Sequence, residues 1–284
     1  MGKIIWLASY PKSGNTWLRI FLTNLRRDGE EPASINDLEG GPIASARGVF
    51  DQLTGIEASD LTPEEIDGLR PDVYEQMTAA AREDLFLKVH DAYTYGADGR
   101  ALLAAPGSRA IYLLRNPLDV AVAVANHNSY DHDTAIAHMA DAEFALAAGS
   151  GRLSEQLRQR LLTWSGHVLS WVEAPIPVKV LRYEDMKEHP LETFAEAARF
   201  AGLPADSERV RKAVEFSDFK ELRRQEQEVG FQERPPQTPS FFREDGWGVW
   251  RRELTPEQAA RVIRDHRGVM RRFGYLTDEG EPVF

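Results

Sequence analysis

The residues with the clearest chemical potential stand near the start of the chain, in the order Tyr10-Pro11-Lys12-Ser13-Gly14-Asn15-Thr16-Trp17. Residues 4–8 before them form a short apolar run, which predicts a strand buried on both faces of a parallel sheet. A strand, a glycine-containing turn and a helix N-terminus form an anion cradle, because free backbone N–H groups and the helix dipole act at one place. Lys12 adds a positive charge and Ser13 and Thr16 add hydroxyl donors, so the segment predicts an anion site.

The order of these residues differs from that of a Walker A phosphate loop. In that pattern glycine comes early and the lysine stands next to the Ser or Thr that holds magnesium, whereas Lys12 here precedes Ser13 and Gly14. Lys-Ser-Gly alone would be interpreted as an ordinary strand–helix turn with an exposed lysine. The longer string, placed after a buried strand, is far more specific.

Composition limits the class of protein. The 284 residues are 42% hydrophobic and 28% charged, which is ordinary for a globular chain. With 34 Lys and Arg against 45 Asp and Glu, the net charge is −11, so we expect no nucleic-acid partner and a local gathering of cations at any anion site. There is no cysteine, which excludes disulfides and thiolate chemistry and fits the cytoplasmic location that we predict. No apolar run approaches the ~18 residues of a membrane span.

Strands and helices alternate along the chain. Further buried strands are predicted at residues 85–89, 110–114 and 178–181, and helices from residues 16, 63, 117 and 256. This alternation predicts an α/β fold, a single P-loop-like domain over residues 1–284 with a central parallel sheet flanked by helices. Two less regular stretches are interpreted as insertions, at about residues 28–81 and 127–151. We also expect a long helix over residues 154–173 and a mobile loop over residues 225–240.

The first motif resembles the opening signature of the cytosolic-type sulfotransferases that use 3′-phosphoadenylyl sulfate. That signature reads Tyr-Pro-Lys-Ser-Gly-Thr-Thr-Trp, and Asn15 replaces its first Thr here. The resemblance implies that Trp17 stacks on the adenine of the donor, although core packing would be the preferred explanation for an isolated tryptophan. It also implies that the donor's 5′-phosphosulfate is gripped by the loop residues, which are Lys12, Ser13, Gly14, Asn15 and Thr16.

Residues 111–122 are similar to the family's segment for the 3′-phosphate. Arg115 leaves the end of a predicted buried strand, where a guanidinium can fork onto a phosphate. An ion pair with Asp119, one helical turn later, is the alternative role for Arg115. The family usually carries a serine where this chain has Ala123, so one hydroxyl contact to the phosphate is missing. Asn126 and His127, one turn further on, are its candidate substitutes.

Three later residues are implied at the adenine. Tyr183, in the sequence Tyr183-Glu184-Asp185, resembles the family's Tyr-Glu-Asp segment, and Ser217 and Phe219 resemble a short segment that lines the base. A strand end and a helix cap would account for the same residues without a ligand.

The last signature is only partly retained. Residues 241–251 resemble the family's closing loop, and the resemblance extends to Phe241, Phe242 and Arg243 as donor-binding residues. Glu244 and Asp245 replace the Lys and Gly of that loop, so Glu244 is not expected to bind phosphate.

A general base is implied by Lys88-Val89-His90, which resembles the family's Lys-x-His. Strand alternation sends Lys88 and His90 to one side. The resemblance makes His90 the catalytic base, Lys88 a support for the transferring sulfuryl group and Lys12 a support for the bridging oxygen. Taken alone, any of the seven histidines would be interpreted as a surface or core residue. Three others, His127, His132 and His138, fit no zinc template, and we expect no metal.

The sequence thus predicts a sulfotransferase that moves a sulfuryl group by in-line displacement to a hydroxyl or amine of a small-molecule acceptor. 3′-Phosphoadenylyl sulfate is the expected co-substrate and adenosine 3′,5′-bisphosphate the product, without a metal. A catalytically weakened nucleotide-binding protein on the same fold and a P-loop phosphotransferase are the alternatives. The acceptor and the oligomeric state are not predicted. Four aromatic residues would line an acceptor pocket or the core: Phe50, Tyr93, Tyr95 and Phe144.

Overall fold

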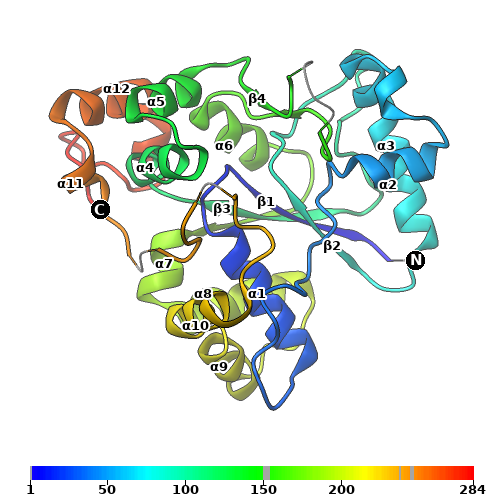
Figure 1. Cartoon of the computed structure of the whole chain (residues 1–284), viewed down its shortest axis with the longest axis horizontal. Helices are drawn as coiled ribbons and strands as arrows, with labels where there is room; N and C mark the ends of the chain where they lie inside the picture. Colours follow the sequence, from blue (N-terminus) through cyan, green and yellow to red (C-terminus); the bar gives the residue numbers. More distant parts are fainter. Residues whose placement is uncertain (1, 150–153, 237, 244–245) are drawn as a thin grey trace. The chain divides into compact units, whose positions relative to one another are not determined.

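Strands and helices alternate along the chain in the computed structural model, which describes residues 2–149, 154–236, 238–243 and 246–284 (Figure 1). The strands are β1 (Ile4–Ser9), β2 (Leu85–Val89), β3 (Arg109–Leu114), β4 (Ala145–Leu146), β5 (Gln159–Arg160) and β6 (Val178–Arg182). The helices are α1 (Asn15–Arg27), α2 (Arg47–Thr54), η1 (Ala58–Asp60), α3 (Pro63–Ala80), α4 (Pro117–Asn128), α5 (His132–Ala140), α6 (Trp164–Val172), α7 (Tyr183–Glu188), α8 (Pro190–Ala201), α9 (Ser207–Glu215), α10 (Phe219–Val229), α11 (Trp250–Glu253) and α12 (Pro256–Arg272). The predicted α/β class is confirmed.

The main sheet has the strand order β2-β1-β3-β6. β1 and β2 pair in parallel with Ile4 opposite Leu85, and every residue of β1 is buried. Because both faces of β1 are covered, its side chains read as a continuous apolar run rather than an alternating one. All four predicted strands of this sheet are therefore confirmed, including the one that ends immediately before the first motif.

Contacts divide the chain into two compact units. The first comprises Met1–Tyr10, Gly40–Tyr112 and Asp141–Val180, and the second comprises Pro11–Glu39, Leu113–Ala140 and Leu181–Phe284. β1 thus belongs to the first unit, and the loop that follows it opens the second. The single-domain organisation and its two insertions stay predictions.

In the first unit, residues 154–163 before α6 form no helix and hold the short strand β5, so the predicted helix over residues 154–173 is wrong for its first half. Helix α6 begins only at Trp164, after Thr163 accepts a capping bond from the backbone of Gly166 at 2.9 Å. Upstream, the Leu157 amide donates to the carbonyl oxygen of Ser45 at 2.7 Å. Apolar residues spaced four apart lie on one face of a helix, but they also lie on one face of a strand, because four is an even number. The spacing alone therefore does not distinguish the two structures, and tertiary pairing decides between them.

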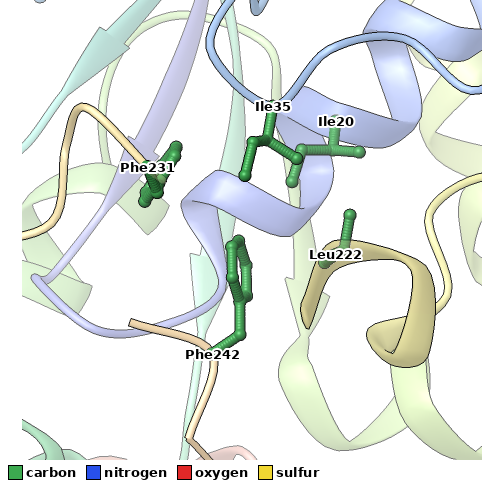
Figure 2. Packing of buried hydrophobic residues seen from close by; sticks show 5 residues of the cluster. All are labelled: Ile20, Ile35, Leu222, Phe231 and Phe242. Carbon is green, nitrogen blue, oxygen red and sulfur yellow. The ribbon is translucent and has the colours of Figure 1, made fainter. Parts of the chain in front are cut away.

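In the second unit, a hydrophobic cluster joins α1, α10 and the segment after α10 (Figure 2). Its buried members are Ile20, Ile35, Leu222, Phe231 and Phe242, and Figure 2 shows Phe242 pointing into it. The predicted loop over residues 225–240 is wrong at its start, because Gln225 to Val229 continue α10. Gln225 is buried, and its Oε1 accepts from the Ile35 amide at 3.0 Å, which fixes this turn of the helix.

Candidate active site

The loop between β1 and α1 has two residues in the left-handed region. Lys12 has φ 69° and Gly14 has φ 98°. A Cβ on Gly14 would lie 2.8 Å from Cδ2 of Tyr183, so both the backbone angle and the space require glycine. For Lys12 the left-handed conformation costs about 1 kcal/mol, a strain that is typical of functional loops. Such turns direct successive amides toward one point and form a concavity for anions.

The N-terminus of α1 carries no capping side chain. Gly14 occupies the capping position, where the helix has neither a capping side-chain bond nor an acidic residue in its first turn. Ser13 is 1% exposed, and its Oγ has no hydrogen-bond partner in the part of the chain that the structure describes. A buried hydroxyl without a partner is unfavourable, and an anion oxygen in the loop would satisfy it. The residues predicted for the anion cradle therefore come together, with Asn15 and Thr16 starting the helix.

The cation of the loop is held by an aromatic ring and a histidine. Lys12 Nζ lies 4.1 Å from the centroid of the Phe241 ring and 3.5 Å from Nδ1 of His127. His127 is on α4, one turn after Ala123, where the expected serine is missing. The structure thus brings His127 to the lysine of the loop.

Arg115 is tied to the same loop. Its Nη1 donates to the carbonyl oxygen of Lys12 at 3.0 Å, and its guanidinium lies over the Tyr183 ring at 4.4 Å. Its Nε is buried and has no partner within the described ranges. Asp119, considered as an ion-pair partner, accepts from the amides of Gly248 at 2.8 Å and Trp250 at 3.1 Å. Arg115 therefore keeps a donor for a ligand, while Asp119 holds the segment before α11.

The residues implied at the adenine also gather in the second unit. Trp17 Nε1 donates to the carbonyl oxygen of Ser217 at 2.9 Å, and its ring meets Tyr183 edge-on at 5.9 Å. Lys187, which sequence reasoning missed, lies 4.7 Å from the Trp17 ring and 5.7 Å from the Phe219 ring. Burial lowers the pKa of Lys187 to about 8. Its only sequence signal is its place one helical turn after Tyr183.

The closing segment is described in part. Phe241 contacts Lys12, Phe242 is buried in the cluster of Figure 2, and Arg243 is exposed. Glu244 and Asp245 lie outside the described residues.

The predicted base is in the first unit. His90 directly follows β2, and its Nδ1 lies 2.9 Å from the carbonyl oxygen of Ser9 and 3.3 Å from Ser9 Oγ. A proton on Nδ1 donated to that carbonyl leaves the lone pair on Nε2, the form that a general base requires. Lys88 belongs to β2, where its backbone bonds to Gly40 and Ala44.

Two buried networks that the sequence did not reveal hold the chain at His90. The Nε2 of His167 donates to the carbonyl oxygen of His90 at 3.0 Å, and its Nδ1 accepts from the Tyr112 hydroxyl at 2.8 Å. Arg70 binds both carboxylate oxygens of Asp91, at 2.8 and 3.0 Å, with both side chains almost fully buried. The backbone at the strand end is therefore fixed by groups from distant segments.

Comparison with known proteins identifies the family. The sulfotransferase domain model matches residues 3–274, so the chain belongs to the sulfotransferase family. Cytosolic sulfotransferase 1 of Arabidopsis thaliana is 26% identical over 91% of this chain and 76% of its own length. Sulfotransferase 1B1 of Canis lupus familiaris is 26% identical over 89% of this chain and 79% of its own length. The alignment with cytosolic sulfotransferase 16 of A. thaliana spans 55% of this chain and 48% of that protein.

Solved structures show the same fold. Retinol dehydratase, in complex with androsterone and the inactive cofactor PAP, has a TM-score of 0.60 at 18% identity, over 94% of this chain and 80% of that one. Mouse sulfotransferase SULT7A1 complexed with PAP has a TM-score of 0.57 at 18% identity, over 98% of this chain and 86% of that one.

Two other features, a membrane-spanning helix and a metal cluster, are absent from the described residues. None of their helices combines the length and apolarity needed to cross a membrane. Nor do these residues include a group of three or more His, Asp or Glu that could hold a metal ion.

Acid should weaken the fold through His167. Burial lowers its pKa to about 4 in the folded state, against about 6.5 when unfolded. Between these values the unfolded chain binds the extra proton, so stability is complete above pH 6.5 and is lost as pH falls toward 4. The expected loss from this group is about 3 kcal/mol in total, measured as the free energy of unfolding in urea at successive pH values.

The variant His167→Gln is the comparison for this titration. It should be less stable at pH 7 but should show a shallower decline between pH 6.5 and 4. Equal slopes for the two proteins would contradict the assignment of a buried neutral histidine.

Proposed function

We propose that this protein transfers a sulfuryl group from 3′-phosphoadenylyl sulfate to a hydroxyl or amine of a small-molecule acceptor. The observation that carries the proposal is the anion cradle. In it the Ser13 hydroxyl, which has no hydrogen-bond partner among the described residues, and the N-terminus of α1, which has no capping side chain, adjoin the Lys12 cation. Membership of the sulfotransferase family and structural neighbours that bind PAP support this donor.

In the proposed reaction His90 accepts a proton from the acceptor at Nε2 as the acceptor oxygen or nitrogen attacks the sulfur. The bond between sulfur and the bridging oxygen breaks, and its electron pair leaves with adenosine 3′,5′-bisphosphate. Lys12 offsets the charge that develops on that oxygen, and Lys88 steadies the transferring group. Positioning and electrostatics then carry most of the barrier reduction, as in phosphoryl transfer. The donor arrives activated, so the proposal requires no metal.

The remaining donor contacts are proposed from the contacts in the second unit. Arg115, whose Nε has no partner in the part of the chain that the structure describes, is assigned to the 3′-phosphate, together with Arg243. Trp17, Tyr183, Ser217 and Phe219 are assigned to the adenine, with the Phe241 and Phe242 rings as a wall. Asn15 and Thr16 complete the loop around the 5′-phosphosulfate.

The acceptor is proposed to be a small organic molecule because structural neighbours were solved with such compounds. Retinol dehydratase has been solved with retinol and with androsterone. The cytosolic sulfotransferases of Arabidopsis thaliana support the proposed cytoplasmic location.

The variant His90→Ala should lose turnover about 10²- to 10⁴-fold, the usual contribution of a general base. Its affinity for adenosine 3′,5′-bisphosphate should stay near that of the wild type, because none of the proposed contacts to the nucleotide involves the His90 side chain. Transfer of radiolabelled sulfate, with and without magnesium, measures the first quantity and calorimetry the second. His189→Ala, at an exposed histidine, is the matched control. Near-full kcat/KM in the His90 variant would remove it from the base role, and magnesium dependence would favour a phosphotransferase.

The variant Lys12→Ala should weaken nucleotide binding as well as turnover. Loss of a charge-assisted contact predicts a roughly 10- to 100-fold weaker affinity for adenosine 3′,5′-bisphosphate by calorimetry. Lys220→Ala, at an exposed lysine of α10, should change neither quantity. Unchanged affinity in the Lys12 variant would count against the anion cradle.

A further inference from the structure

One carboxylate on α10 binds residues 240–242, where the closing segment (residues 241–251) begins. Glu226 Oε1 accepts from the Phe241 amide at 2.6 Å, and Oε2 accepts from the Phe242 amide at 3.0 Å and from the Ser240 hydroxyl at 2.8 Å. The Glu226 side chain is 7% exposed, and Nε of Arg234 lies 3.8 Å from its Oε1. Glu226 belongs to none of the sequence motifs.

A buried carboxylate is costly unless its oxygens are satisfied. Here two consecutive amides and a hydroxyl meet the same group, and bonds to an ionised acceptor are the stronger kind. Two consecutive amides that donate to one carboxylate also fix the orientation of the backbone at Phe241 and Phe242, since both N–H groups must point toward α10. Glu226 therefore determines the backbone from which the Phe241 and Phe242 side chains depart.

The two rings then act on different partners. Phe242 packs into the cluster with Ile20 and Leu222 (Figure 2), which anchors the segment on α1 and α10. Phe241 presents its face to Lys12 Nζ at 4.1 Å and meets the His127 ring edge-on at 6.4 Å. A continuous series of contacts thus runs from the Glu226 carboxylate through the Phe241 backbone and ring to the cation of the anion cradle.

We infer that Glu226 is a positioning residue for Lys12 and thereby for the donor nucleotide. This inference rests on the proposed function. A lysine side chain has many rotamers, and ordering it when the nucleotide binds is unfavourable. With the Phe241 ring fixed by Glu226, Lys12 is ordered before the nucleotide arrives. Without the carboxylate the ring is released, and the affinity for the donor nucleotide falls by about tenfold. This factor corresponds to roughly the conformational entropy that one such side chain loses when it is ordered.

A double-mutant cycle measured by calorimetry with adenosine 3′,5′-bisphosphate tests the inference. Glu226→Ala should weaken binding about tenfold in the wild-type background and less than twofold in a Phe241→Ala background. Phe241→Ala alone should weaken binding at least as much, because the ring is also proposed to line the donor site. Glu228→Ala is the matched control on the same helix, because Glu228 is exposed and pairs with Arg224; it should bind like the wild type.

A loss of equal size in both backgrounds would show that Glu226 supports the fold without acting through Phe241, and would overturn the inference. Unchanged or tighter binding in Glu226→Ala would overturn it too. Should that variant fail to fold, Glu226→Gln, which keeps the shape and one acceptor oxygen, replaces it in the cycle with an expected loss of about threefold. If the wild type itself does not bind the nucleotide, the proposed function fails, which is a separate outcome.

Discussion

The turn that follows β1 is the constraint on which the donor site depends. Lys12 and Gly14 both adopt left-handed backbone angles there, and α1 begins directly after them without a capping side chain. Tyr183 closes the space beside Gly14, so no side chain fits at that position. The strain at Lys12 and the unsatisfied hydroxyl of Ser13 are both unfavourable without a ligand. A bound anion would remove at least the second of these costs.

The elements around this turn fix the remaining side chains through their own backbone. Arg115 leaves the end of β3 and returns a bond to the Lys12 carbonyl, while Tyr183 begins α7 and lies under its guanidinium. Glu184 is buried, accepts from the Asn116 amide at 3.0 Å and from the Tyr275 hydroxyl at 2.9 Å, and so ties α7 to the start of α4. Although the protein is acidic overall, these contacts hold the cations of Lys12 and Arg115 at the same loop.

The fold class and the local elements of this protein could be predicted from sequence, whereas the long-range contacts of individual side chains could not. β1, the turn and α1 are encoded within one short stretch, as are the caps at Thr62 and Thr255. The contacts of Glu226, Lys187 and His167 join residues that no local pattern relates, because burial and partner choice depend on tertiary packing. The same reason explains residues 154–163, whose apolar spacing is compatible with a helix but whose backbone bonds to Ser45 and its neighbours instead.

A crystal structure of the complex with adenosine 3′,5′-bisphosphate would show where the nucleotide binds. We expect the 5′-phosphate within hydrogen-bond distance of the Ser13 hydroxyl and of the first amides of α1, with Lys12 Nζ turned toward it. Nucleotide bound elsewhere, or a loop whose amides are bonded within the protein when the nucleotide is present, would rule out the anion cradle as the donor site.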